Sequence, residues 1–378
     1  MNILITGGAG FIGSRLAARL HKHGHRITIL DNLSRQVHGD NPEFSADLQK
    51  IADCIEGDVC DRILLADLVK HQEVIIHFAA ETGTGQSMYA IQHYEHVNIA
   101  GTSVLLDILV NEGLGSVRKL VVASSRAVYG EGQYRCSTHG VVYPQARKPE
   151  LMSVGQFEPI CPLCNSIVAV EPTSEEAPFA PTSFYGLTKQ VQEQMVLMFA
   201  NALKIDGIAL RYQNVYGPGQ SLSNPYTGLL AVFSNLVRKN QDLNVFEDGN
   251  ESRDFVYIDD VVEATASCVD EKIKGTWTFN VGSGVRTSVL EVAKAVINYF
   301  GANAKVNISG DFRVGDIRHN MADISSLKAL TGFSPRWSFD DGLHQFLDWA
   351  SKQDAVDAGF EGSMKELADR GLLGVKKP

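Results

Sequence analysis

Short apolar runs alternate with amphipathic stretches through the first third of the chain. Four runs have the composition of buried strands, namely residues 2–6 (NILIT), 26–31 (RITILD), 73–80 (EVIIHFAA) and 118–125 (RKLVVASS). Two stretches, 11–24 and 94–113, repeat their apolar positions at helical spacing, and Gly24 is a typical helix end. Strands that alternate with helices in this way predict a parallel sheet with helices on both faces.

The pattern is less regular in the second half of the chain. Residues 207–215 and 277–283 have the composition of later strands of the same sheet. The stretches 217–254 and 284–350 mix helical and strand patterns. We therefore expect an α/β protein with a doubly wound parallel sheet and a smaller mixed α/β unit built from separate pieces.

A glycine-rich turn joins the first strand to the first helix. TGGAGFIG (6–13) fits G-x-G-x-x-G, and glycines there let the backbone approach a pyrophosphate at the helix N-terminus. Asp31 ends the second strand, where a carboxylate accepts hydrogen bonds from a ribose 2′-hydroxyl and repels a 2′-phosphate. The pattern predicts a Rossmann-type site for NAD, although Arg35 lies close by in sequence and leaves NADP open.

These features suggest a division of the chain. Residues 1–216 with 255–283 form the expected NAD-binding Rossmann domain, and 217–254 with 284–350 form the smaller substrate domain. Residues 351–378 are a tail, in which Ser363 and Glu366 have the spacing of a capping box and predict a short surface helix.

Composition narrows the class of partner. The formal net charge of −10 opposes non-specific binding to nucleic acid and favours a small molecule. No apolar run approaches the roughly 20 residues that cross a bilayer, and the N-terminus does not resemble a signal peptide. The six cysteines are spread along a large chain, which indicates reduced thiols and a cytoplasmic location without membrane attachment.

The stretch YGLTK contains a candidate catalytic pair. Tyr185 and Lys189 are four residues apart at the start of a predicted helix, so they share one face. A free phenol has a pKa near 10, and a neighbouring ammonium group favours the phenolate. SSRAVYG (124–130) ends a predicted strand and supplies further hydroxyl groups.

In this order, the motifs resemble those of the extended short-chain dehydrogenase/reductases of the nucleotide-sugar epimerase/dehydratase group. The resemblance runs nearly end to end through TGGAGFIG, GDV (57–59), HFAA (77–80), SSRAVYG, YGLTK, QNVYGPG (213–219) and RDFVYIDD (253–260). It implies a catalytic triad of Ser125, Tyr185 and Lys189. It implies that the residues contacting the cofactor are Gly7, Gly10, Phe11, Ile12, Gly13, Asp31, Asn32, Asp58, Val59, Ala79, Ala80, Asn98, Tyr185 and Lys189. It implies that the residues contacting a nucleotide sugar are Gln86, Ser87, Ser125, Arg126, Asn214, Arg253 and Arg313. A homodimer formed through the helices at 94–113 and 185–203 is also implied.

The residues after Ser125 favour one reaction of this group. Sugar dehydratases of this kind carry an Asp-Glu pair where this chain has Arg126 and Ala127, which cannot act as a general acid or base at neutral pH. We therefore expect a 4-epimerase. The motifs YGEGQYRC, CPLC, QSLSNPYTG (220–228) and GDIRHNMADIS resemble a group of epimerases that interconvert dTDP-L-rhamnose and dTDP-6-deoxy-L-talose. A UDP-hexose 4-epimerase and a non-catalytic NAD-sensing regulatory protein are the alternatives.

The stretch between Ser125 and Tyr185 is long for this family and contains a possible metal site. Cys136-x2-His139 and Cys161-x2-Cys164 have the spacing of a structural zinc site with four protein ligands. We expect an inserted zinc-knuckle loop over residues 131–172, since this stretch lacks a regular apolar period and a metal would stabilise it. Free thiols on a disordered loop are the alternative.

Overall fold

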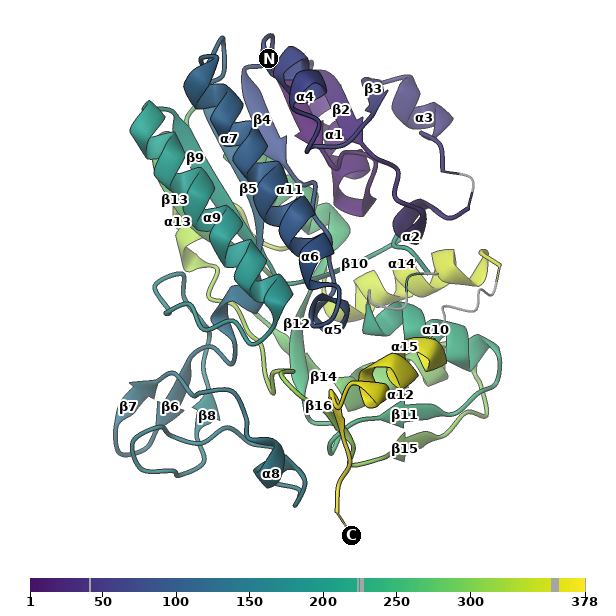
Figure 1. The fold of residues 1–378 in the computed structure, drawn as a ribbon. Helices are drawn as coiled ribbons and strands as arrows, with labels where there is room; N and C mark the ends of the chain where they lie inside the picture. The colour runs from purple at the N-terminus through teal and green to yellow at the C-terminus, as the bar shows by residue number, and fades with distance from the viewer. Residues whose placement is uncertain (41, 223, 225–227, 355–359, 378) are drawn as a thin grey trace.

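A seven-stranded sheet forms the centre of the computed structural model, which describes residues 1–40, 42–222, 224, 228–354 and 360–377. The strand order is β13-β9-β5-β4-β1-β2-β3, and each neighbouring pair is parallel (Figure 1). The strands are β1 (Asn2–Thr6), β2 (Arg26–Asp31), β3 (Ala52–Glu56), β4 (Val74–His77), β5 (Lys119–Ser125), β9 (Asp206–Tyr212) and β13 (Thr276–Val281). The doubly wound parallel sheet expected from the sequence is confirmed.

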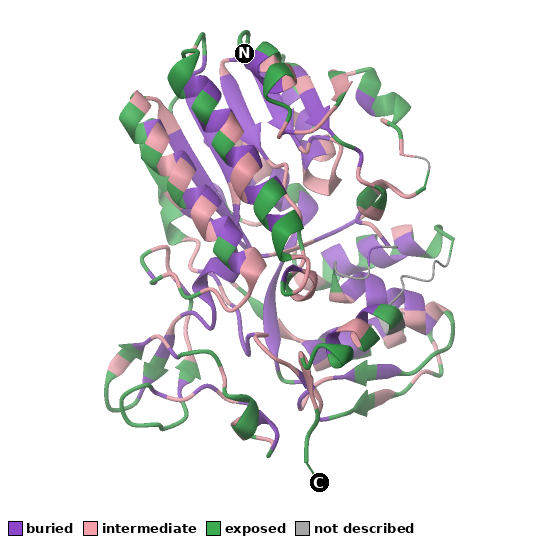
Figure 2. Cartoon of the chain, viewed as in Figure 1, coloured by how far each residue is buried: buried purple, intermediate pink, exposed green. Residues whose placement is uncertain are grey.

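Helices cover both faces of this sheet because its strands are apolar on both sides. Ile3 and Ile5 share a buried cluster with α1 (Phe11–Lys22) and α11 (Ile258–Val269). Leu4 points the other way and shares a second cluster with α4 (Arg62–Val69), α7 (Gly101–Asn111) and α9 (Phe184–Leu203). Figure 2 shows the strands buried between these layers, while the outer sides of α7 and α9 are exposed.

Several element boundaries differ from the sequence-based expectation. The helix expected at 94–113 is divided into α6 (Ile91–Tyr94), a π-helical turn over Glu95–Ala100, and α7. The single strand expected at 207–215 is divided into β9, which stays in the central sheet, and β10 (Asn214–Tyr216). Strand β10 leaves that sheet and pairs with β12 (Ser252–Tyr257). Strand β3 and helix α4 were not predicted. The short helices α2 (Arg35–His38), α3 (Ala46–Gln49) and α5 (Thr84–Ser87) lie in the connecting loops.

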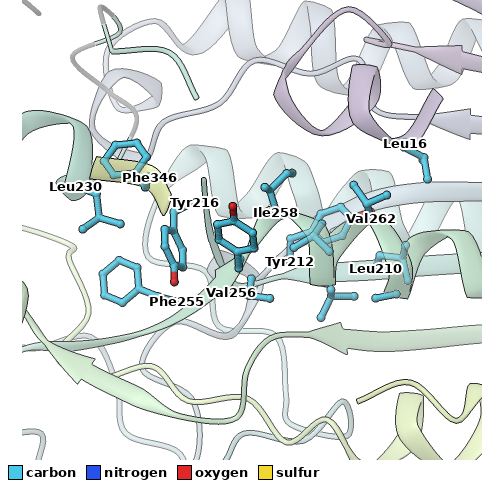
Figure 3. Close-up of a cluster of buried hydrophobic side chains, with 14 of the residues drawn as sticks. Leu16, Leu210, Tyr212, Tyr216, Leu230, Phe255, Val256, Ile258, Val262 and Phe346 are labelled. Atoms are coloured by element: carbon cyan, nitrogen blue, oxygen red, sulfur yellow. The ribbon is translucent and has the colours of Figure 1, made fainter. Parts of the chain in front are cut away.

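The smaller sheets lie beyond the carboxyl ends of the central strands. One joins β10, β12 and β14 (Arg286–Ser288), and another joins β11 (Leu243–Val245) and β15 (Val306–Ile308). The helices packed around them are α10 (Leu229–Arg238), α12 (Val289–Phe300) and α14 (Phe339–Ser351), while α13 (Ser325–Thr331) follows β16 (Phe312–Arg313). Figure 3 shows that buried side chains continue from Leu16 and Leu210 to Leu230 and Phe346. One apolar core therefore links the central sheet to the smaller sheets. Residues 223 and 225–227 of the QSLSNPYTG motif lie outside the described residues.

The stretch between β5 and α9 folds as a small separate unit, which we call the insert (residues 131–172). It contains an antiparallel sheet of β6 (Tyr134–Cys136), β7 (Gly140–Val142) and β8 (Ala169–Val170). The short helix α8 (Pro149–Met152) lies between β7 and β8 in the chain. Its apolar cluster is formed by only five buried residues: Tyr134, Cys136, Val142, Cys161 and Val168. Such a small core rarely stabilises a fold without a cross-link.

The chain ends in α15 (Phe360–Asp369) and β17 (Leu373–Gly374), which pairs with β16. The capping box predicted at Ser363 is wrong, because the helix already begins at Phe360. Ser363 lies inside the helix, where its side chain is buried. No helix in the described part of the chain is long and apolar enough to cross a bilayer.

Candidate active site

A cavity of about 710 Å³ opens at the carboxyl ends of the central strands. Doubly wound sheets bind ligands at this edge, and the volume is within the usual range for a ligand site. The predicted residues that line it are Gly7, Gly10, Phe11, Ile12, Gly13, Asp31, Asn32, Asp58, Val59, Ala79, Ala80, Ser125, Arg126, Tyr185, Lys189, Asn214, Arg253 and Arg313.

The turn between β1 and α1 requires glycine. Gly7 has a φ of +69°, and a Cβ added there would lie 2.7 Å from the backbone nitrogen of Ala79. A Cβ on Gly13 would lie 2.7 Å from the Gly7 carbonyl oxygen. The turn therefore packs closely against the β4 end and leaves the N-terminus of α1 facing the cavity. A pyrophosphate fits this arrangement, since the first turn of a helix offers free N–H donors.

The carboxylate of Asp31 lies at the end of β2 and is almost fully buried. It accepts hydrogen bonds from the backbone N–H groups of Ala9 (2.9 Å) and Leu33 (3.0 Å). Asn32 donates to Asp58 at 3.3 Å. These contacts fix a negatively charged corner beside the glycine turn, which suits the hydroxyl groups of a ribose better than a phosphate.

The structure brings Ser125, Tyr185 and Lys189 to the same wall of the cavity. Ser125 ends β5, and its hydroxyl accepts from the backbone N–H of Ala127 at 3.2 Å. Tyr185 and Lys189 lie in the first turns of α9, which packs on β5. The Lys189 ammonium donates to the Ala123 carbonyl oxygen at 3.0 Å and lies 6.0 Å from the centre of the Tyr185 ring.

Burial controls the charges of this group. It raises the pKa of Tyr185, while the nearby Ser125 hydroxyl and the Arg126 guanidinium act in the opposite direction. Burial also lowers the pKa of Lys189 to about 7 and that of Arg126 to about 10. Arg126 thus remains charged at neutral pH and favours the phenolate form of Tyr185.

Three predicted site residues are not part of the cavity wall. Asn98 is fully buried, where its amide accepts from the Glu81 N–H (2.7 Å) and donates to the Thr188 hydroxyl (2.9 Å). Ser87 is also fully buried and accepts from the Tyr185 N–H at 2.9 Å. Gln86 pairs with the amide of Gln36. In this structure Asn98, Ser87 and Gln86 hydrogen-bond to neighbouring residues of the protein and do not line the cavity themselves.

The same cavity is also lined by basic groups that have few acidic partners. Arg253 donates to Asp316 at 3.0 Å. Arg313 and Arg126 form no ion pair within the described residues, and the buried Nε of Arg313 has no hydrogen-bond partner there. The buried Oδ1 of Asn214 is likewise without a partner in that part of the chain. The unpaired Nε donor of Arg313 indicates an anionic ligand, whereas the unpaired acceptor oxygen of Asn214 indicates a ligand that also carries a hydrogen-bond donor.

Sequence reasoning missed one acidic residue of the cavity lining, Asp316. Asp316 lines the cavity; burial acts to raise its pKa, but the guanidinium groups of Arg253 and Arg313 outweigh this and leave it lowered. The motif GDIRHN contains Asp316, so a signal was present.

A buried ionic network behind this wall was also missed. Arg147 of the insert donates to Glu131 (3.1 Å) and Glu247 (2.8 Å), and Glu247 also accepts from Arg318 at 2.8 Å. All four side chains are at most 5% exposed. The network links the insert to β11 and to the segment after β16, and Glu247 itself lines the cavity.

The four candidate metal ligands meet in the insert. The ligand atoms of Cys136, His139, Cys161 and Cys164 all lie within 4.8 Å of one another. Nδ1 of His139 is 3.6 Å from Sγ of Cys136 and of Cys161, and Sγ of Cys136 is 3.7 Å from Sγ of Cys164. A tetrahedral zinc site with Zn–S bonds near 2.3 Å has ligand separations of about 3.7 Å. Hydrogen bonds to its sulfur, above all the one from the backbone N–H of Thr138, lower the pKa of Cys136 to about 5. The lowered pKa favours the thiolate form, which is the form that zinc binds.

Comparison with known proteins shows the family to which this chain belongs. The profile of the NAD dependent epimerase/dehydratase family matches residues 3–147 and 163–282. The chain belongs to this family. It is 38% identical over 355 residues to a dTDP-L-rhamnose 4-epimerase of Burkholderia thailandensis, covering 93% of this chain and 95% of the relative. It is 30% identical to a UDP-glucose 4-epimerase of Mycolicibacterium smegmatis, covering 92% of this chain and 98% of the relative.

Solved structures agree with this class. A UDP-glucose 4-epimerase of Thermotoga maritima with UDP-glucose has a TM-score of 0.74 and 28% identity, covering 93% of this chain and 99% of that chain. A UDP-glucuronic acid 4-epimerase of Bacillus cereus in complex with UDP-glucuronic acid and NAD has a TM-score of 0.74 and 26% identity, with the same coverage. By its similarity to such nucleotide-sugar 4-epimerases, the chain is an enzyme of the isomerase class.

Proposed function

We propose that this enzyme is an NAD-dependent 4-epimerase that interconverts dTDP-L-rhamnose and dTDP-6-deoxy-L-talose through a 4-keto intermediate. The observation that carries the reaction type is the meeting of Ser125, Tyr185 and Lys189 in one cavity with Arg126 and Arg313, which form no ion pair within the described residues. The 38% identity to a dTDP-L-rhamnose 4-epimerase supports the sugar. A UDP-hexose is the second candidate, because a UDP-glucose 4-epimerase is 30% identical.

The residues around the glycine turn are proposed to hold NAD. The pyrophosphate would lie at the N-terminus of α1, and Asp31 would accept from a ribose hydroxyl. Asn32, Asp58 and Val59 would surround the adenosine half. When bound, NAD supplies a reversible hydride acceptor for C4 of the sugar.

The proton at O4 is proposed to move to and from Tyr185. Its phenolate is the base, and Ser125 hydrogen-bonds the same oxygen. The positive charge of Arg126, and that of Lys189 in its protonated form, stabilise the phenolate. Arg253, Arg313 and Asn214 would hold the diphosphate while the sugar turns its other face. Because Arg126 and Ala127 carry no carboxylate, the site lacks the acid and base that would remove water from the sugar.

NAD(H) is expected to remain bound through purification, at about one per chain. The reaction returns its hydride to the same sugar, so a tightly held cofactor needs no exchange. Denaturing the protein and quantifying the released nucleotide by chromatography measures this. A protein that is active only after addition of NADP would contradict the assignment of Asp31.

Incubation with a panel of nucleotide sugars, followed by NMR of the C4 proton, tests the substrate. We expect dTDP-L-rhamnose to give its C4 epimer. Conversion of UDP-glucose without action on the rhamnose compound would favour the UDP-hexose alternative. Binding of NAD without turnover of any sugar would favour a cofactor-sensing protein.

The insert is proposed to hold one structural zinc ion. Four N and S ligands leave no open position, so this metal would stabilise the insert and take no part in the reaction. The remaining cysteines, Cys54, Cys60 and Cys268, form no disulfide in the described residues. Reduced thiols support a cytoplasmic location.

A homodimer through α7 and α9 is part of the proposal. Large apolar side chains are exposed on these helices, namely Val110 on α7 and Leu187 and Met198 on α9. We also propose that NAD binds to the unit built on the central sheet and that the sugar nucleotide binds to the unit built on the smaller sheets.

A further inference from the structure

Two segments outside the matched family profile meet at one short strand of the substrate wall. The profile omits residues 148–162 of the insert and everything after residue 282, which includes β16 and the C-terminal segment 360–377. Strand β16 is only two residues long and contains Arg313. So short a strand does not fix its own position, and the surrounding contacts must do so.

The insert packs against one side of β16. Phe312 is 2% exposed and shares an apolar cluster with Met152 and Phe157 of the insert, and Val314 packs against the same cluster. These contacts join residues about 155 positions apart in the sequence. They bury the side chain next to Arg313 and so limit how far its backbone can move.

The C-terminal segment pairs with the edge of the same strand. Phe312 faces Gly374 and Arg313 faces Leu373 across an antiparallel pair, and the Val314 N–H donates to the Leu372 carbonyl oxygen at 3.0 Å. A Cβ on Gly374 would lie 2.3 Å from the Phe312 ring. Figure 1 shows α15 below α5, with the chain running down from it past β16.

The insert and the C-terminal segment also touch each other. The Lys377 N–H donates to the Ser153 carbonyl oxygen at 2.8 Å, and the Lys376 side chain packs over Gly155 and Gly310. Strand β16 is therefore held between two segments that are themselves joined.

Helix α15 completes the enclosure of Arg313. The Arg313 Nη2 contacts the Met364 sulfur at 3.7 Å, and its guanidinium lies 5.1 Å from the centre of the Phe246 ring. Its buried Nε has no partner among the described residues. The side chain is thus packed between apolar groups with donors free for a ligand, as a guanidinium that binds phosphate requires.

The same helix reaches the loop that precedes α6. Leu367 is buried and lies next to Gly85, and the Arg370 guanidinium stacks 4.2 Å from the centre of the Tyr89 ring. This loop also contains Ser87, which accepts from the backbone of Tyr185. The C-terminal segment therefore contacts both the loop that supports Tyr185 and the strand that contains Arg313.

We propose that residues 149–157 of the insert and residues 360–377 form a clamp on β16 that positions Arg313 on the diphosphate of the substrate. This rests on the proposed function, since it assumes a nucleoside diphosphate ligand. Met364 and Gly374 are then positioning residues: they act through Arg313 and do not touch the reacting atoms.

Gly374→Val in the full-length protein tests the clamp, because the added side chain meets the buried Phe312 ring and separates β17 from β16. Gly362→Ala is the matched control, since it lies in α15 with no heavy atom near the added Cβ. Isothermal titration with dTDP should show about tenfold weaker binding for Gly374→Val and no change for the control. Arg313→Met should weaken dTDP binding about 10–100-fold.

A double-mutant cycle separates positioning from general damage. In the Arg313→Met background, Gly374→Val should cause little further loss of dTDP affinity, because both changes remove the same contact. Met364→Ala, which shortens a partly exposed side chain, should weaken dTDP binding in the same direction and covers the case in which Gly374→Val fails to fold. NAD(H) content and kcat should stay near wild type while KM rises.

The outcomes distinguish this inference from the proposed function. Wild-type affinity for dTDP in both Gly374→Val and Met364→Ala would overturn the clamp. Full additivity with Arg313→Met would overturn it as well. If the wild-type protein binds neither dTDP nor UDP, the proposed function fails instead.

Discussion

The substitution Tyr185→Phe is expected to abolish epimerisation, with turnover reduced about 10²–10⁴-fold. The change removes only the phenol oxygen, which is the proposed base for the proton at O4. The ring stays in place, because it packs edge-on against Tyr94 at 6.5 Å between centres. The NAD(H) content of the purified variant should therefore match that of the wild type.

Turnover of dTDP-L-rhamnose, followed by NMR, measures this effect. Tyr299→Phe is a matched control, since Tyr299 lies on α12 and does not line the cavity. The control should keep wild-type turnover. A Tyr185→Phe enzyme with more than about half of the wild-type activity would show that another group is the base.

Loss of the proposed zinc ion is expected to have the second largest effect. The metal-replete protein should hold about one zinc per chain, and Cys161→Ser should hold far less. Cys161 is fully buried in the five-residue apolar cluster of the insert, so its loss removes a ligand from the centre of that unit. The insert should loosen, since metal binding and folding are coupled in such small units.

Elemental analysis measures the metal, and enzyme kinetics measure the consequence. KM for the nucleotide sugar should rise in Cys161→Ser, while NAD(H) content stays unchanged, because the insert borders the substrate wall. Cys54→Ser, in the distant strand β3, should change neither quantity. Metal-replete wild-type protein without zinc would refute the metal site.

Features set by local spacing could be predicted from the sequence. The glycine turn, the Tyr185–Lys189 pair, and the Cys-x2-His and Cys-x2-Cys pairs each lie within a few residues. Their pattern therefore already specifies one face or one turn. The meeting of Cys136 with Cys161 required the additional assumption of a shared site, which the structure supports by bringing all four ligands together.

Features that depend on distant pairing could not be predicted in this way. Asn98 matches a motif, yet the π-helical turn directs its amide behind the cavity wall. The pairing of Arg147 with Glu247 joins residues 100 positions apart, and that of Arg318 with Glu158 joins residues 160 apart. No local period encodes such contacts, because they arise only when the units pack together.

The buried network of Arg147, Glu131, Glu247 and Arg318 affects how the insert could be gained or lost among related proteins. A descendant that replaced the insert by a short loop would lose Arg147 and Glu131 together, and Glu247 would keep Arg318 as its remaining partner in this network. Each ion pair lost in this way leaves a buried charged side chain with one partner fewer, which destabilises the region around it. The insert, Glu247 and Arg318 should therefore be gained or lost together, and exchanging the loop between relatives would require compensating changes on the smaller sheets.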